Sequence, residues 1–122
     1  MSNLYKKSFT KPDDFKKPDK AVAEIVNMGS VMASKVVAQP GWKWSESIKP
    51  LVGGDSYQAP HLGVVTQGSL HVVHDDGTEL TINAGDVFAC SAGHDAWVVG
   101  DVEVIIYEFN NSGKDWAVWT TG

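Results

Sequence analysis

The sequence predicts an all-β domain built from antiparallel strands in two sheets, and three observations support this fold class. Short β-favouring runs alternate with turn signals at intervals of about ten residues from Ala21 to Phe109. No segment carries the apolar stripe of an amphipathic helix for more than about two turns. The length of 122 residues and the hydrophobic content of 43% suit one domain with a buried core.

Each predicted strand ends at a turn signal. Asp76-Gly77 is the clearest, because both residues tolerate the positive φ of a two-residue hairpin turn. The segment VEVIIYEF is apolar at both alternating sets of positions, which predicts a last strand covered on both faces. The other predicted strands and their turns are AVAEIVNM with Gly29-Ser30, SVMASKVVA with Pro40-Gly41, HLGVVTQ with Gly68, SLHVV with Asp75-Asp76-Gly77, TELTI with Asn83-Ala84-Gly85-Asp86, VFACS with Gly93, and AWVVG, which leads into VEVIIYEF.

Charge and composition divide the chain into three parts. Residues 1–20 hold six lysines and three aspartates, whereas the rest of the chain is acidic and brings the net charge to -5. We predict a lysine-rich lead over 1–20, a barrel over 21–110, and a tail over 111–122. Because the tail carries Trp116 and Trp119, we expect it to pack on the barrel or on a second subunit.

The same composition restricts the partners. All ten basic residues are lysines, and arginine provides the bidentate contacts that recognise phosphate and guanine, so we expect no nucleic-acid partner. No apolar run approaches the roughly 20 residues of a membrane span, and the first residues lack the apolar segment of a secretory signal. The single cysteine, Cys90, suits a reducing compartment. These features predict a cytoplasmic protein with no membrane partner.

Two stretches resemble the sequence motifs of the cupin superfamily. Residues 85–94, GDVFACSAGH, are similar to the second cupin motif, G-x5-P-x-G-x2-H. Residues 61–68, HLGVVTQG, are similar to the end of the first motif, and Pro40-Gly41 to its start. The resemblance implies a small single-domain cupin, a double-stranded β-helix or jelly roll of two antiparallel sheets around one mouth. It also implies a homodimer paired through its sheets.

The positions that bind metal in cupins are mostly occupied here by residues that cannot ligate. By the motif spacing they fall on Ser47, Lys49, His61 and Ala96. A different set, His61, His94 and Glu46, would suit iron or another divalent metal such as zinc, manganese or nickel if a bulge turned Glu46 inward. We therefore predict no firm cofactor, with a divalent metal at low occupancy as the alternative.

Two histidines are the strongest candidates for catalysis. His61 and His94 both fall near the predicted mouth, and Asp95 follows His94 directly. A carboxylate beside an imidazole can fix its tautomer and raise its basicity, as a general base requires. Adjacent residues on a strand point to opposite faces, so a solvent-facing Asp95 is the open alternative.

A second group of residues is expected to bind the ligand. Tryptophans around the mouth would form an aromatic wall, although two of them could equally cover the outer face of the sheet. Lys49 is either a mouth cation for a carboxylate or a solvated strand-end lysine. Residues 48–60 form the longest gap between predicted strands and could fold over the opening. The predicted ligand-binding residues are Trp42, Trp44, Glu46, Lys49, Tyr57, Gln58 and Trp97.

The sequence therefore predicts a small cupin that binds a small organic molecule in the barrel mouth. Two alternatives stay open: a metal-assisted or histidine-based isomerase, lyase or oxygenase, and a non-catalytic sensory or dimeric scaffold module. Two neutral histidines predict a ligand that is uncharged or carries one carboxylate. Binding of a neutral ligand should then weaken below about pH 6, as the imidazoles become charged.

Overall fold

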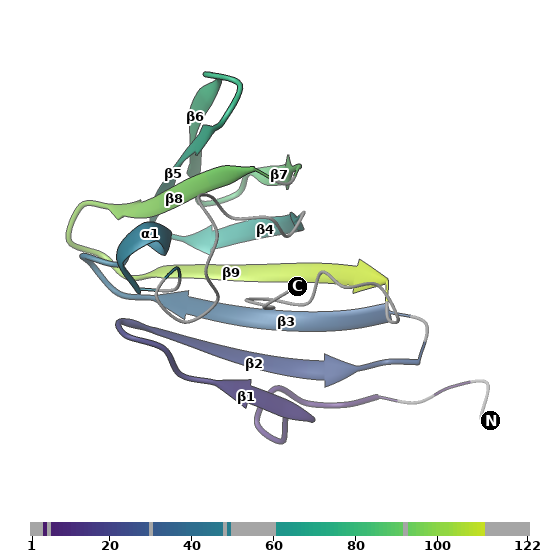
Figure 1. The fold of residues 1–122 in the computed structure, drawn as a ribbon. Helices are drawn as coiled ribbons and strands as arrows, with labels where there is room; N and C mark the ends of the chain where they lie inside the picture. Colours follow the sequence, from purple (N-terminus) through teal and green to yellow (C-terminus); the bar gives the residue numbers. More distant parts are fainter. Residues whose placement is uncertain are drawn as a thin grey trace.

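The fold consists of two antiparallel sheets (Figure 1). It is seen in a computed structural model that describes residues 4, 6–29, 31–47, 49, 61–91 and 93–111. The large sheet has the strand order β1-β2-β3-β9-β4-β7, and the small sheet has the order β6-β5-β8. The elements are β1 (Asp14–Lys16), β2 (Ala21–Asn27), β3 (Val31–Ala38), the single-turn helix α1 (Trp44–Ser47), β4 (His61–Gln67), β5 (Ser69–His74), β6 (Glu79–Asn83), β7 (Val87–Cys90), β8 (His94–Val99) and β9 (Val104–Asn111).

The predicted antiparallel all-β class is confirmed, and the predicted runs correspond to strands β2 to β9. Strand β1 lies within the predicted lead and pairs with β2 in register. The tail residues 112–122, with Trp116 and Trp119, lie outside the described residues. None of the described helices is long and apolar enough to cross a membrane.

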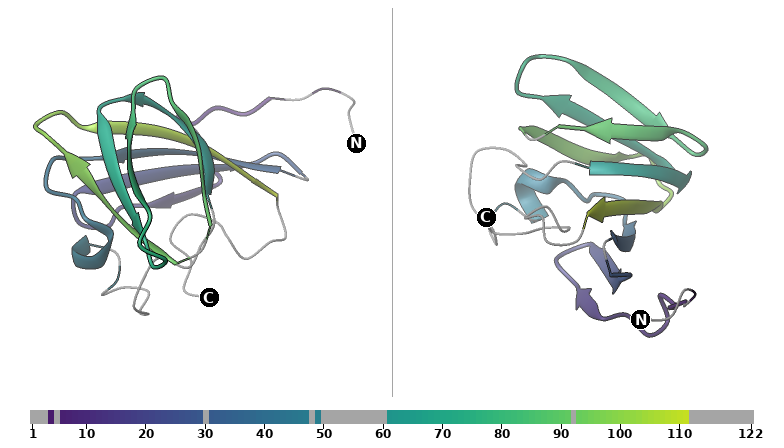
Figure 2. Two further views of the ribbon diagram at one scale, coloured as in Figure 1. Left: turned by 90° about the horizontal axis from the view of Figure 1, so that it is seen from above. Right: turned by 90° about the vertical axis from the view of Figure 1, so that its right-hand side faces the viewer.

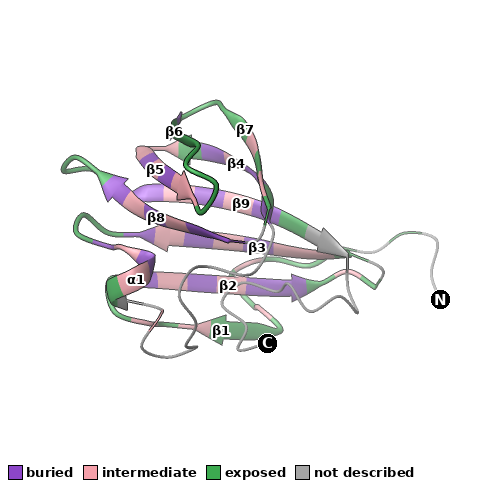
Figure 3. Cartoon of the chain, turned by 45° about the horizontal axis from the view of Figure 1, so that its top comes forward, coloured by how far each residue is buried: buried purple, intermediate pink, exposed green. Residues whose placement is uncertain are grey.

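The core lies between the two sheets, whose arrangement is seen in the views of Figure 2. Alternating side chains build it, because neighbouring strand residues point to opposite faces. In β9, Val104 and Ile106 are buried while Ile105 and Tyr107 are half-buried, so this strand is partly covered on its outer face as predicted. Figure 3 shows the same alternation of buried and less buried residues along β2 and β3.

Gly63 allows β4 and β9 to approach closely. A Cβ built at this position would collide with the Tyr107 carbonyl oxygen and lie 3.0 Å from Glu108 Cγ and 3.2 Å from Phe88 Cζ. The carbonyl is part of a paired strand and cannot move without loss of ladder bonds. Gly63 is therefore needed for the interstrand spacing rather than for an unusual backbone conformation.

We predict that Gly63→Ala lowers the free energy of unfolding by about 3 kcal/mol, since overpacked cores must displace backbone or side chains. Urea denaturation measures this loss. The control is Gly77→Ala, where φ is +94° and no heavy atom lies within 4 Å of the added Cβ. Its cost of about 1 kcal/mol should reflect backbone strain alone. Equal stability of Gly63→Ala and the wild type would contradict the prediction.

Candidate functional site

A buried histidine–carboxylate pair lies on the inner face of the large sheet. His61 begins β4, and Glu108 lies on the adjacent β9, where it is the register partner of Gly63. His61 Nδ1 donates a hydrogen bond to the Glu108 carboxylate, and both side chains are buried. Because an isolated buried charge is costly, each group satisfies the other. The pair leaves Nε2 as the second functional atom of the His61 ring.

Sequence reasoning did not identify Glu108. A signal was present, since Glu108 follows Val104 and Ile106 at the inward positions of an alternating strand. A carboxylate in such a row must find a buried partner. Which partner it finds depends on the strand order, because β4 lies next to β9 although more than forty residues of chain separate His61 from Glu108.

His94 lies against His61 from the opposite sheet. The two rings meet edge to face, with centroids 5.2 Å apart and planes inclined by 76°. His94 Nδ1 donates a hydrogen bond to the Ser91 carbonyl oxygen at 2.9 Å. Burial, reinforced by the neighbouring His61, lowers the pKa of His94 from 6.5 to about 4. His94 is therefore neutral at pH 7, with its proton on Nδ1 and a lone pair on Nε2.

This result changes the expected pH dependence of binding. A ligand held by neutral His94 would keep that contact down to about pH 4, rather than lose it below about pH 6, because its pKa is lowered to about 4. The sequence expectation assumed an imidazole at its reference pKa. The sequence does not show that His94 is buried, and burial is the main cause of its lowered pKa.

The Asp95 carboxylate bonds to backbone nitrogens rather than to the His94 ring. Asp95 Oδ1 accepts hydrogen bonds from the backbone nitrogens of Ser45 at 3.2 Å and Ala96 at 2.8 Å. The alternation along β8 turns His94 inward and Asp95 toward α1, where Asp95 is half-buried rather than solvent-facing. Glu108 and His61 form the carboxylate–imidazole pair instead.

The predicted tryptophan wall does not form. Trp42 and Trp44 are buried in the core, with exposures of 5% and 1%. Trp97 lies on the outer face of β8, where Lys43 Nζ is 5.1 Å from its ring centroid and the His71 ring is 5.0 Å away. The isolated bridge between Lys43 and Trp97 explains this, because the residues on either side of Lys43 then turn inward.

The other predicted ligand-binding residues are also separate from the histidines or outside the described part of the chain. Glu46 is exposed on α1. Lys49 is half-buried and is not among the described residues that line either cavity near the histidines. Tyr57 and Gln58 lie outside the described residues.

Two spaces meet at His94. A small interior cavity of about 40 Å³ is lined by Trp42, His61, His94 and Glu108 together with core aliphatic residues. A groove of about 460 Å³ runs between residues of β6 and β7, which are edge strands of the two sheets. Four residues line both spaces: Val72, Phe88, Cys90 and His94. The buried pair is therefore separated from the groove by a single layer of side chains.

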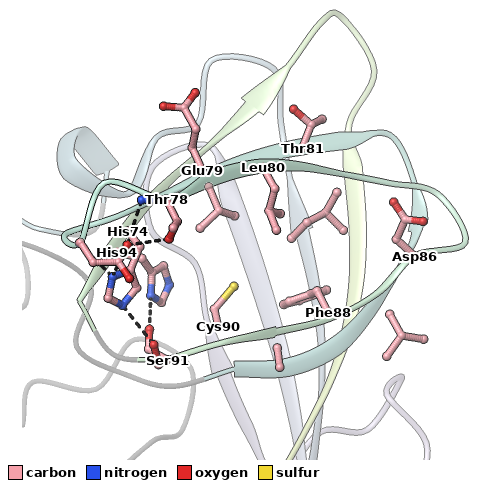
Figure 4. Close-up of a pocket in the computed structure, with 15 residues that line it drawn as sticks. His74, Thr78, Glu79, Leu80, Thr81, Asp86, Phe88, Cys90, Ser91 and His94 are labelled. Carbon is pink, nitrogen blue, oxygen red and sulfur yellow. Dashed lines mark hydrogen bonds and ion pairs between the residues drawn. The ribbon is translucent and has the colours of Figure 1, made fainter.

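The groove has a polar end, an apolar middle and an acidic rim. Figure 4 shows His74, Ser91 and His94 gathered at one end, Asp86 at the other, and Phe88 between them. His74 Nε2 lies 3.0 Å from Ser91 Oγ, and His74 Nδ1 accepts the backbone hydrogen of Asp76 at 3.1 Å. With this tautomer His74 donates to Ser91, which links the β5–β6 turn to the segment after β7.

The position of His74 just before a turn signal predicts an exposed side chain, whereas the structure places it half-buried against Ser91. The alternation of β5 gives the correct side, because Leu70 and Val72 are buried and His74 has the same parity. His71 has the opposite parity, so its alternation with Leu70 and Val72 predicts the outer face, where it lies with Trp97. The turn signal that follows His74 favoured an exposed residue, although the strand alternation already indicated the inner side.

Cys90 is not an activated thiol. It is half-buried, and burial together with the charge of Glu108 raises its pKa to about 11. The thiolate is the nucleophilic form, so at neutral pH this residue is an unreactive part of the lining. This agrees with its position between apolar residues in the sequence.

The described residues do not form a metal site. No group of three or more His, Cys, Asp or Glu side chains among them is placed to hold an ion. His61 and His94 supply two imidazoles, and Glu46 is exposed on α1 rather than turned inward. Catalytic metal centres generally use three protein ligands. The described residues therefore do not fit the metal that the family resemblance implies.

Comparison with known proteins gives a clear answer on the fold. A cupin_2 domain of an XRE-family transcriptional regulator from Enterobacter cloacae matches with a TM-score of 0.56 and 12% identity, over 79% of this chain and 100% of that chain. The chain has the cupin fold. KdgF from Halomonas sp. is similar to it at a TM-score of 0.60 and 21% identity, covering 84% of this chain and 89% of that one.

A third structure with this cupin-like arrangement is a protein of unknown function from Rhizobium leguminosarum. It matches with a TM-score of 0.62 and 14% identity, over 90% of this chain and 99% of that chain. A scan of protein-family models and a search of curated proteins gave no match. These comparisons establish the cupin architecture, and the chemistry has to be inferred from the residues of the site.

Proposed function

We propose that this cupin binds a small organic molecule in the groove between β6 and β7, with His94 as the innermost polar contact. The observation that carries the proposal is the meeting of the groove and the buried His61–Glu108 pair at His94. A volume of about 460 Å³ is within the range of small-molecule sites. The mixture of apolar walls with a few convergent polar groups is also typical of such sites.

The charge of the groove favours an uncharged or cationic ligand. Asp76 and Asp86 line it, whereas the Glu79 carboxylate contacts His71 on the outer face, and no lysine is among the described lining residues. Hydrogen bonds from Thr78 lower the pKa of Asp76, so that this carboxylate is ionised at neutral pH. An anionic ligand would be repelled by these groups. The proposal therefore replaces the carboxylate ligand that Lys49 was expected to hold.

A ligand screen by two-dimensional NMR tests the function. Neutral polyols, amines and carboxylates of matched size are titrated into ¹⁵N-labelled protein treated with EDTA. Neutral or amine compounds should shift amides of groove residues such as Leu80 and Phe88, and carboxylates should bind more weakly. His94→Ala should weaken binding by about 5- to 150-fold, the equivalent of about 1–3 kcal/mol. The control variant His71→Ala changes the outer face only.

Shifts confined to other surfaces, or equal affinity of the His94→Ala variant and the wild type, would refute this assignment. Retention of binding in EDTA would separate direct recognition from recognition through a metal. A requirement for added divalent metal would instead indicate a site completed by residues beyond the described ones.

Histidine-based proton transfer is the second candidate function, as in an isomerase or lyase. The buried pair favours it, because a carboxylate that accepts the Nδ1 hydrogen raises the basicity of the other ring nitrogen. His94 supplies a second, neutral imidazole whose Nδ1 is held by Ser91. Two imidazoles in contact can pass a proton between them. This arrangement suits abstraction of a proton from the bound molecule followed by its return at another atom.

We also propose that two copies pair through the outer face of the large sheet. Leu62, Val87 and Phe109 are 48%, 75% and 48% exposed on β4, β7 and β9. Exposed apolar side chains on neighbouring strands favour burial against another surface. Light scattering after size exclusion should give twice the chain mass, and Leu62→Lys should shift the protein to the monomer. Val102→Lys, at another exposed valine, is the control; a monomeric wild type would contradict the pairing.

A further inference from the structure

Two buried polar atoms near the His61–Glu108 pair have no hydrogen-bond partner among the described residues. They are the indole nitrogen Nε1 of Trp42 and the hydroxyl oxygen of Ser34. Trp42 is 5% exposed and Ser34 is 1% exposed. An unsatisfied buried donor costs about 1–3 kcal/mol, and in folded proteins such groups usually bind protein or ordered water. These atoms therefore indicate a missing partner.

The interior cavity offers a place for that partner. Trp42 lines it together with His61, His94 and Glu108. Ser34 lies directly opposite Glu108 in the β3–β9 ladder, so the second unsatisfied group is next to the same carboxylate. The cavity measures about 40 Å³. A water molecule needs at least about 10–15 Å³, whereas sites for organic ligands begin at about 300 Å³.

The chemistry of the lining restricts the occupant further. The Trp42 indole can only donate a hydrogen bond, whereas the Glu108 carboxylate and the Nε2 lone pair of His94 can accept. The occupant must therefore accept one hydrogen bond and donate others. A halide or a small oxyanion cannot donate and would face Glu108, and an ammonium ion cannot accept. Water satisfies both requirements.

We propose that an ordered water molecule occupies this cavity, accepts the indole hydrogen of Trp42, and donates to the acceptors on His94 and Glu108. Trp42 is then a positioning residue for the water. A water held by two or more polar partners is stable enough to be part of the structure.

The water would connect the groove to the buried pair. His94 lines both spaces, and because its Nδ1 hydrogen is held by the Ser91 carbonyl, its Nε2 lone pair can accept either from the water or from a ligand in the groove. A ligand that donates to this nitrogen would therefore compete with the water for it. This competition rests on the proposed function, whereas the water site itself does not.

Water-to-protein NMR experiments test the site. The protein contains five tryptophans, and Trp42→Phe assigns the Trp42 indole signal by its disappearance. A cross-peak between that indole hydrogen and water, with the sign of a long-lived complex in both the laboratory and rotating frames, is expected. The Trp97 indole on the outer face is the control and should show only fast surface hydration. If Trp42→Phe does not fold, through-space contacts to Val36 and Ala96 make the assignment in the wild type.

Absence of the water cross-peak at the Trp42 indole would overturn the proposal. So would a crystal structure with a dry cavity, or with a metal ion in it. Failure of the ligand screen with the water cross-peak present would remove the proposed function and leave the water site intact. Loss of the cross-peak in a protein that still binds ligand would remove the water site alone.

Discussion

Replacement of Glu108 with alanine is expected to lower the free energy of unfolding by about 3–5 kcal/mol, the typical cost of removing one partner of a buried pair. The loss arises because His61 Nδ1 donates to this carboxylate in a buried position. In the variant the imidazole keeps its polar hydrogen and has no carboxylate to receive it. Urea denaturation at pH 7 followed by tryptophan fluorescence measures the effect.

Two further variants separate the pair from a general effect of charge. Glu108→Gln preserves an acceptor oxygen and nearly the same volume, so its loss should be clearly smaller than that of Glu108→Ala. Glu79→Gln removes a carboxylate that is 61% exposed and contacts His71 on the outer face. Its effect should lie within about 1 kcal/mol, as is usual for exposed ion pairs. Similar losses for the Ala variants of Glu108 and Glu79 would show that the buried pair is not a major source of stability.

The second large effect is expected when the pH is lowered from 7 to 4. His94 has its pKa lowered from 6.5 to about 4 in the folded state, chiefly by burial. Between these pH values the unfolded chain binds more protons at this residue than the folded chain does. Stability therefore rises with pH across the window, is complete above about pH 6.5, and is lost as the pH falls to about 4. The full contribution is roughly 3 kcal/mol.

A pH series of urea denaturations on the wild type and His94→Asn measures this term. Asparagine can still donate to the Ser91 carbonyl but does not titrate, so the stability gap between the two proteins should narrow by roughly 3 kcal/mol from pH 7 to pH 4. His71→Gln, on the outer face, is the matched control for the loss of a histidine that lies outside the cavity. A constant gap between the wild type and His94→Asn would mean that His94 keeps an ordinary pKa in the folded state.

The sequence alone determined the fold class and the parity of most strand residues. Turn signals at regular spacing and two-residue alternation are local properties, and they sufficed for β2 to β9 and for the inward side of His61 and the outward side of His71. The motif-like stretches around Gly68 and Gly93 indicated the cupin arrangement for the same reason. The two site histidines could be selected because both come from these stretches.

The tertiary structure alone decided which groups meet. Glu108 became the partner of His61 because β4 pairs with β9, a long-range contact that alternation does not specify. Trp42 and Trp44 turned inward because Lys43, which lies between them, bridges to Trp97 on β8. The lowered pKa of His94 likewise depends on burial by both sheets. Local sequence sets the direction of a side chain, whereas its neighbours and its solvation are set by strands that are distant in the chain.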